Sequence, residues 1–301
     1  MYSTGRTFIS LTAAPGPEVE RLRVISTDKV RETVRDLYKQ ACVVINPELK
    51  AAYAKAATEE PSPQGREILT MLVENSELAQ RENLPMCQDT GIAVVFLELG
   101  EEVQFDRPGL VAAVNQGVRE AWKEQFLRAS LVKDPLRRGN TGDNTPAMIH
   151  LDLVPGDHLK IVVGAKGTGA ENMSKTKIMS PSAGVEGAKA FLLETVKAAG
   201  PNACPPLVLG MGIGGNFEEV TRLAKKALYR ALGSPNPDPY YANLEKEWLA
   251  AVNRLGVGPQ GLGGGTTALA LHIEAKSCHI GALPVAVNID CHAHRHKEAI
   301  L

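Results

Sequence analysis

The stretch Pro85-Met-Cys-Gln-Asp-Thr-Gly91 constrains this chain more than any other. It places a thiol, an amide, a carboxylate and a hydroxyl on consecutive residues between a proline and a glycine, which are the residues that most often interrupt regular structure. The apolar run at 92–97 follows at once and is typical of a buried strand. Reactive side chains on a loop anchored by a strand often form a functional site, although a polar turn with an incidental cysteine has the same pattern.

Charge and composition exclude several classes of protein. The formal net charge is -1, which favours neither nucleic acid nor an anionic membrane surface as a partner. No apolar run approaches the roughly 20 residues of a membrane helix, and the N-terminus has no secretory pattern. We therefore expect a cytoplasmic protein. Its five cysteines, an odd number, indicate thiol chemistry or metal binding rather than a disulfide framework.

The first quarter of the chain is predicted to be helical. Residues 1–20 have no periodicity and are expected to form a loose arm, followed by one domain over 21–301 with a helical portion to about residue 83. Capping residues and helical spacing predict a first helix from Ser26-Thr27-Asp28 onwards. Two further helices are predicted at 47–57 and from Pro63 to about Gln80.

The rest of the chain predicts a mixed α/β fold. A helix follows Asp106-Arg-Pro108, and further helices are expected at 183–199, 218–230 and 241–255. Short strands are expected at 207–209 and 285–287. Strands at 147–153 and 159–163, joined through Pro155 and Gly156, are predicted to pair as an antiparallel hairpin. We expect the helical region to pack on short mixed or antiparallel sheets.

Two polar loops are candidates for ligand binding. One is Arg138-Gly-Asn-Thr-Gly-Asp-Asn-Thr-Pro146, which has the composition of either a substrate loop or a solvated linker. The other is Lys166-Gly-Thr-Gly169, in which backbone amides can converge on a carboxylate or phosphate. The alternative for the second loop is a tight turn with a surface lysine.

The run Gly210-Met-Gly-Ile-Gly-Gly215 matches a dinucleotide-binding pattern, but the match is incomplete. A true fingerprint continues into a second strand that ends in an acidic residue, whereas three prolines lie between residues 235 and 239 here. We therefore predict a glycine turn that serves close packing or an anion. Histidines 292, 294 and 296 near the C-terminus fit a solvated tail better than a zinc site.

The cysteines divide by context. Cys87, Cys204 and Cys291 lie in polar loops, whereas Cys42 and Cys278 lie in apolar segments and are expected to be structural. The three loop cysteines are far apart in the sequence. If the fold brings them together, three thiolates suit a soft metal centre, and a cubane iron-sulfur cluster with only three would keep one iron open as a Lewis acid.

The combination of motifs resembles a known family. The Cys87, Arg138, Lys166 and Cys204 loops, together with Cys291, resemble the class I, iron-sulfur-dependent fumarate hydratases and tartrate dehydratases from about residue 20 to the end. The resemblance implies a 4Fe-4S cluster on Cys87, Cys204 and Cys291, held in loops between the sheets, with one iron that no protein residue ligates.

The resemblance also implies substrate contacts. These are Gln88, Asp89 and Arg128, with the loop of Lys166, Gly167 and Gly169 cradling a four-carbon dicarboxylate. The implied reaction is reversible hydration of fumarate to L-malate, for which we expect Asp89 to transfer a proton. A guanidinium such as that of Arg128 binds a carboxylate through two parallel hydrogen bonds.

The resemblance also implies a partner subunit. Its single-chain members carry a further C-terminal domain, whereas this chain ends ten residues after Cys291. We therefore expect an α subunit that acts with a separate β subunit, as an α2β2 assembly. The alternatives are an L(+)-tartrate dehydratase α subunit, a nicotinamide-dependent oxidoreductase and a non-catalytic cluster-binding or scaffold protein.

Overall fold

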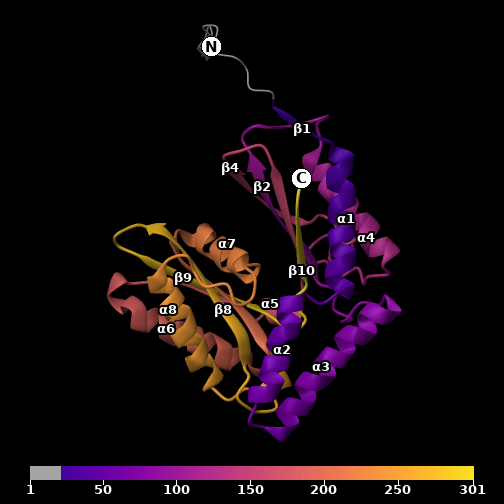
Figure 1. The fold of residues 1–301 in the computed structure, drawn as a ribbon. Coiled ribbons are helices and arrows are strands. Elements are labelled where there is room, and N and C mark those ends of the chain that lie inside the picture. Colours follow the sequence, from indigo (N-terminus) through magenta and orange to yellow (C-terminus); the bar gives the residue numbers. More distant parts are fainter. Residues whose placement is uncertain (1–21) are drawn as a thin grey trace.

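The computed structural model describes residues 22–301, so the loose arm expected over 1–20 lies outside the described residues. The described chain has the expected mixed α/β architecture, with helices packed on two four-stranded sheets (Figure 1). A small parallel pair of strands, β1 (Arg23–Ile25) and β3 (Val103–Phe105), lies beside them. No helix in the described part of the chain could cross a membrane, since none is both long and apolar enough.

The N-terminal helical region is confirmed. Its helices are α1 (Thr27–Val43), α2 (Pro47–Glu59) and α3 (Pro63–Glu82). Ser62 caps α3 by accepting a hydrogen bond from the Gly65 backbone nitrogen, and α3 ends at Asn83, whose φ of 53° is left-handed. This left-handed residue turns the chain toward the Cys87 loop.

The first sheet is built around the apolar strand β2 (Ile92–Gly100). Its order is β10-β5-β2-β4, with β4 (Met148–Val154), β5 (Leu159–Lys166) and β10 (His296–Ile300). The predicted hairpin is therefore wrong, because β2 lies between β4 and β5 and pairs with both. The link through Gly156 instead wraps around the end of β2, where the Glu102 backbone nitrogen donates to the Gly156 carbonyl. A nearly buried strand needs partners on both edges to satisfy its backbone groups.

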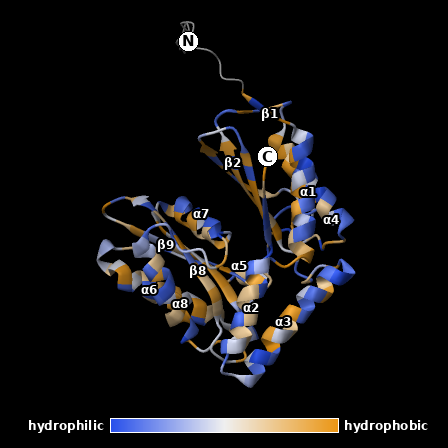
Figure 2. Cartoon of the chain, in the orientation of Figure 1, coloured by the Kyte–Doolittle hydropathy of each residue, from blue (hydrophilic) through white to orange (hydrophobic). Residues whose placement is uncertain are grey.

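Helices α1 and α4 (Leu110–Glu124) cover one face of this sheet. Their contact is a continuous apolar cluster in which Val34, Tyr38 and Trp122 pack against strand residues such as Val95. Figure 2 shows apolar residues concentrated on the strands and on the inward faces of the helices. Burial of these faces drives the packing of the helical region onto the sheet.

The second sheet has the order β6-β9-β7-β8. Its strands are β6 (Lys175–Met179), β7 (Leu207–Gly215), β8 (Ala268–Cys278) and β9 (Leu283–Asp290). Helix α7 (Phe217–Leu228) packs on it, and α6 (Gly184–Ala199) and α8 (Pro239–Asn253) join the large apolar cluster that also includes α2 and α3 residues.

The glycine run lies within strand β7, so the predicted glycine turn is wrong. A Cβ atom at Gly210 would lie 2.1 Å from the Ala224 carbonyl oxygen, and one at Gly212 would lie 2.2 Å from that of Val220. These glycines therefore allow β7 and α7 to approach closely, and the packing role expected for them is confirmed. They do not form a phosphate-binding loop between strand and helix.

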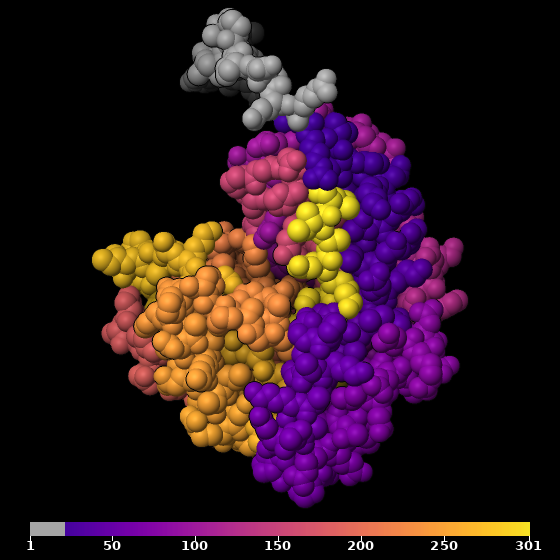
Figure 3. All heavy atoms as spheres, in the orientation of Figure 1, coloured from indigo at the N-terminus to yellow at the C-terminus, as the bar shows by residue number. Residues whose placement is uncertain are grey.

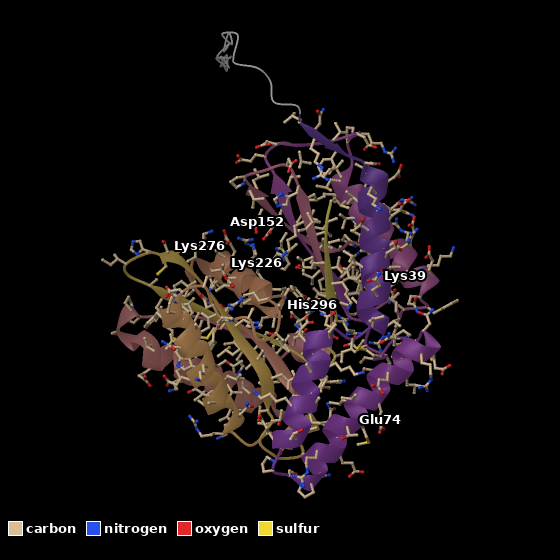
Figure 4. All side chains as sticks on the ribbon, in the orientation of Figure 1. Lys39, Glu74, Asp152, Lys226, Lys276 and His296 are labelled. Atoms are coloured by element: carbon tan, nitrogen blue, oxygen red, sulfur yellow. The ribbon has the colours of Figure 1, made fainter. Side chains whose placement is uncertain are left out.

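A charged seam connects the two sheets. Lys226 of α7 lies 3.0 Å from Asp152 of β4 and 3.0 Å from Glu98 of β2, and Arg222 lies 2.8 Å from Asp152. Figure 4 shows Lys226 and Asp152 turned toward each other. Apolar contacts between the sheets, including that of Phe96 with Tyr229, accompany the seam.

The C-terminal segment is a structural part of the core, contrary to the expected solvated tail. Residues His296–Ile300 form β10, and His294 and His296 are buried. Figure 3 shows this segment wedged between the N-terminal helices and the strands of the first sheet. The solvated tail was predicted from the polar histidine run alone. Its burial depends on strand pairing with β5, which is remote in the sequence.

Candidate active site

The Cys87 loop is held by two hydrogen bonds at Met86. The Met86 backbone nitrogen donates to the Cys42 carbonyl, and the Asn75 side chain donates to the Met86 carbonyl. Cys87 is half-buried, whereas Gln88 is exposed next to it. The loop therefore presents a thiol and an amide at the surface of a fixed backbone.

Cys204 and Cys291 come from the second sheet and lie next to each other. Cys204 precedes β7 in a left-handed conformation with φ 52°, and Cys291 directly follows β9. The His292 backbone nitrogen donates to the Cys204 carbonyl at 3.1 Å, and the Tyr53 hydroxyl donates to the His292 carbonyl. β7 and β9 pair antiparallel, so the start of one and the end of the other meet at one edge.

The thiols of the three loop cysteines are brought into one neighbourhood. Burial raises the pKa of the Cys204 thiol, and the nearby Cys87 thiol and Asp89 raise it further. Burial and Asp290 raise the pKa of Cys291 to about 11. The proximity of thiols in separate loops is a tertiary property that no local motif predicted.

Three thiols are a donor set that suits a soft metal centre such as an iron-sulfur cluster. Within residues 22–301, no three His, Cys, Asp and Glu side chains converge on one point that could hold a metal ion. Cysteines that ligate a cubane bind different irons, so they surround the cluster instead of converging on one atom. Cys87 lies near Cys204, and the residue after Cys291 donates its backbone N–H to the Cys204 carbonyl, so the three loops meet.

Asp89 connects the predicted site residues. Its Oδ1 accepts hydrogen bonds from the Gly91 backbone nitrogen at 3.1 Å and from Arg128 Nη2 at 3.2 Å. Its Oδ2 accepts from the Thr168 backbone nitrogen at 2.9 Å and from the Thr168 hydroxyl at 3.3 Å. One carboxylate beside Cys87 thus joins the loop before β2, the loop after α4 and the loop after β5.

Arg128 is fixed through its backbone while its side chain stays accessible. Its carbonyl accepts hydrogen bonds from the Thr90 hydroxyl and from Trp122 Nε1. Its side chain is 57% exposed. Buried Asn144, from the polar 138–146 loop, accepts from the Ser130 and Leu131 backbone nitrogens and donates to the Gly91 carbonyl. That loop therefore supports the site.

The predicted Lys166 to Gly169 loop is shorter than expected, because Lys166 ends β5 and the short helix α5 (Thr168–Glu171) begins after Gly167. This stretch lies against Asp89, but the lysine side chain points elsewhere. Lys166 is 1% exposed, and its ammonium lies 2.7 Å from the Ile289 carbonyl, 3.2 Å from Glu171 and 3.6 Å from Asp290. The alternative of a surface lysine is therefore wrong. A Cβ atom at Gly167 would be 3.4 Å from Asp89 Oδ2, and one at Gly169 would be 3.3 Å from the Asn202 carbonyl. The backbone of this loop, rather than the ammonium, faces the site.

Sequence reasoning missed the buried charges behind the cysteines. Asp290 lies 2.8 Å from His294 Nδ1, and Arg295 is buried beside them. The sequence signal for these charges is their position in the Cys291-His-Ala-His-Arg-His296 run. This signal was missed because alternating polar residues at a chain end usually point to solvent. Cys42 is buried, as expected for a structural thiol, whereas Cys278, also expected to be structural, is exposed at the end of β8.

Comparisons with known proteins identify the family. The family model described as fumarate hydratase (Fumerase) matches residues 31–300. A Methanocaldococcus jannaschii protein named "Putative L(+)-tartrate dehydratase subunit alpha" is 39% identical over 273 residues, which cover 89% of this chain and 95% of that protein. The L(+)-tartrate dehydratase subunit alpha of Escherichia coli K12 is 36% identical over 241 residues, 78% of each chain. The chain therefore belongs to the class I fumarate hydratase and tartrate dehydratase α-subunit family, whose members are iron-sulfur-dependent hydro-lyases.

Proposed function

We propose that this chain is the α subunit of a hydro-lyase that reversibly hydrates fumarate to L-malate. The observation that carries the proposal is the position of Asp89, which joins the Cys87 loop, Arg128 and the Thr168 loop in one hydrogen-bonded unit. A carboxylate, a guanidinium and backbone amides beside three thiols are the groups that hydration of a dicarboxylate requires.

The proposed cofactor is a 4Fe-4S cluster on Cys87, Cys204 and Cys291, with one iron that the protein does not ligate. When bound, that iron supplies a Lewis acid for a substrate carboxylate and hydroxyl. The convergence of the three loops supports this ligand set.

The chain's own residues bind and orient the substrate and move a proton. The accessible guanidinium of Arg128 pairs with one substrate carboxylate through charge-assisted hydrogen bonds. Gln88, next to Asp89 in the sequence, and the backbone at Gly167 and Gly169 are the further substrate contacts in this proposal. In the hydration direction, the oxygen of water adds to one alkene carbon and Asp89 accepts the proton that this water releases. The negative charge that develops at the other alkene carbon is neutralised by a proton taken up there from an acid of the completed site, which gives malate.

A separate β subunit is the proposed partner, in an α2β2 assembly. Both relatives above carry names that describe an α subunit. The exposure of Gln88 and Arg128 is consistent with a site that a second chain completes. We expect little turnover from the α subunit alone.

L(+)-tartrate is the second candidate substrate, and the names of the relatives favour it. Dehydration of tartrate to oxaloacetate uses the same elements, because tartrate differs from malate by one hydroxyl. The Asp89 and Arg128 geometry serves both acids, so the choice depends on the completed site.

Anaerobic reconstitution of this chain with iron and sulfide tests the proposal. Visible absorption and EPR after reduction should report a cluster that is lost in Cys87→Ser, Cys204→Ser and Cys291→Ser. The matched controls Cys42→Ser and Cys278→Ser should keep it. Malate or tartrate should perturb the spectrum, and the acid that perturbs it at the lower concentration is the preferred substrate.

The contradicting results are equally specific. A cluster that persists in one of the three loop variants would remove that cysteine from the ligand set. Failure of the wild-type chain to assemble any cluster would overturn the proposed chemistry.

A further inference from the structure

Arg295 is a buried guanidinium whose hydrogen-bonding capacity is not used. It is 3% exposed and lies between Cys291 and strand β10. Its Nε and Nη1 atoms are buried, and the described protein atoms offer neither a hydrogen-bond partner. The other buried cation nearby, Lys166, has a carbonyl and two carboxylates around its ammonium.

A buried cation with unpaired N–H groups is unfavourable, because it has lost its hydration without replacement. A fold tolerates such a group where an anion accompanies it. Asp290 supplies negative charge nearby, but no described protein atom accepts a hydrogen bond from Nε or Nη1, so Arg295 indicates a further acceptor of negative charge.

The surroundings of Arg295 show where that anion lies. Burial opposes the charge, but Cys42, Cys291, Cys87 and Asp290 outweigh burial and raise the pKa of Arg295. Two of these cysteines belong to the ligand set. At its other end, Nη2 borders the substrate loop, since a Cβ atom at Gly167 would be 3.5 Å from Nη2. The side chain thus extends from the cysteine loops to the loop after β5.

We propose that Arg295 is a positioning residue for the iron-sulfur cluster, with Nε and Nη1 donating hydrogen bonds to the sulfur atoms of the cluster and its thiolates. This inference rests on the cluster of the proposed function. Hydrogen bonds and positive charge beside a cluster neutralise part of its negative charge and help to retain it. The same hydrogen bonds and positive charge favour the reduced cluster, which carries one more negative charge than the oxidised cluster. They therefore raise the reduction potential of the cluster.

The test compares wild-type protein with Arg295→Gln, which removes the charge, and Arg295→Lys, which keeps it without the planar fork. All are reconstituted anaerobically in the full chain. Iron release to a chelator and the midpoint potential from EPR-monitored titration are measured. We expect Arg295→Gln to release iron about 10- to 100-fold faster and to show a lower potential. Arg295→Lys should release iron at an intermediate rate, with a potential closer to wild type.

Arg107→Gln is the matched control, because Arg107 is an exposed arginine paired with Asp28 of α1 and is not part of the proposed site. It should keep wild-type iron release and potential. Thermal unfolding of the cluster-free proteins adds a readout independent of the cluster. Cluster-free Arg295→Gln should unfold no earlier than the cluster-free wild type, because the variant removes an unpaired buried charge.

Two outcomes would overturn the proposal while leaving the proposed function intact. The first is a wild-type cluster with iron release and potential unchanged in Arg295→Gln. The second is a marked drop in the unfolding temperature of the cluster-free variant without faster iron release, which would make Arg295 a structural residue. Absence of a cluster in the wild-type chain overturns both proposals, so the two failures are distinguishable.

Discussion

The backbone nitrogen of Thr168 donates a hydrogen bond to Asp89 Oδ2 at 2.9 Å, across 79 residues of sequence. This contact ties the loop after β5 to the loop before β2 at the point where Cys87 is presented. It holds the Asp89 carboxylate in one orientation and makes it the residue on which the proposed mechanism depends most.

Replacing Asp89 by Asn should abolish most of the turnover without loss of the cluster. The amide cannot accept the proton from the adding water, and loss of a general base typically lowers kcat by about 10²- to 10⁴-fold. Steady-state hydration by the enzyme assembled with its β subunit measures this. Asp134→Asn, which changes a carboxylate in a surface turn, is the control and should retain activity. Near-normal kcat in Asp89→Asn with an intact cluster would exclude Asp89 as the proton acceptor.

Replacing Arg128 by Gln should weaken substrate binding. A charge-assisted hydrogen bond contributes about 1.5–3 kcal/mol, so KM for the dicarboxylate should rise about 10- to 100-fold. Arg128→Lys should recover part of this loss, because it keeps the charge but not the fork. Arg137→Gln, at a highly exposed arginine, serves as the control. If KM did not change in Arg128→Gln, a different cation would have to bind the carboxylate.

Lys166 should matter for stability more than for substrate affinity. Lys166→Met removes the buried lysine beside Asp290, while Glu171 keeps its pair with Lys225, and the loss should lower the free energy of unfolding by about 3–5 kcal/mol. Lys160→Met, which breaks a surface pair with Glu298, should cost at most about 1 kcal/mol. Denaturant unfolding compares the two. A stable Lys166→Met protein with a raised KM would instead make the ammonium a substrate contact.

His272 should make stability depend on pH. It is 2% exposed on β8, and burial, with a smaller effect from Arg230, lowers its pKa from 6.5 to about 4. Between these values the unfolded chain binds a proton that the folded chain does not. The free energy of unfolding should therefore fall as pH falls from about 6.5 to 4, by on the order of 3 kcal/mol in total.

Urea unfolding at several pH values between 7 and 4 measures this dependence. His272→Leu should show a shallower slope in the same window, by close to one proton. Some slope should remain, because burial also lowers the pKa of His296 to about 3. An unchanged slope in His272→Leu would show that other groups account for the pH dependence.

Local signals were sufficient for the helices and for the main strands. Capping residues and apolar spacing predicted α1, alanine content predicted α2, and the prolines at 61 and 63 predicted the start of α3. The short apolar run predicted β2. The resemblance supplied Cys87, Cys204 and Cys291 as a set. The proximity of Cys204 to Cys87 agrees with that set, while their role as ligands stays a prediction.

The errors share one physical cause. The predicted hairpin at 147–163 is wrong because β2 inserts between its two strands. The predicted solvated histidine tail is wrong because β10 pairs with β5. Both depend on partners that are remote in the sequence. Similarly, Gly210 and Gly212 form a strand because α7 packs directly on them.

The sequence by itself determined the N-terminal helices, the strand β2, the family and the residues proposed to carry the chemistry, because capping, periodicity and motif composition are local properties. Only the tertiary structure decided strand order, the direction of the Lys166 side chain and the isolation of Arg295. Strand neighbours and the burial of a charge depend on long-range packing, in which each group contacts atoms of residues that are up to hundreds of positions away in the sequence.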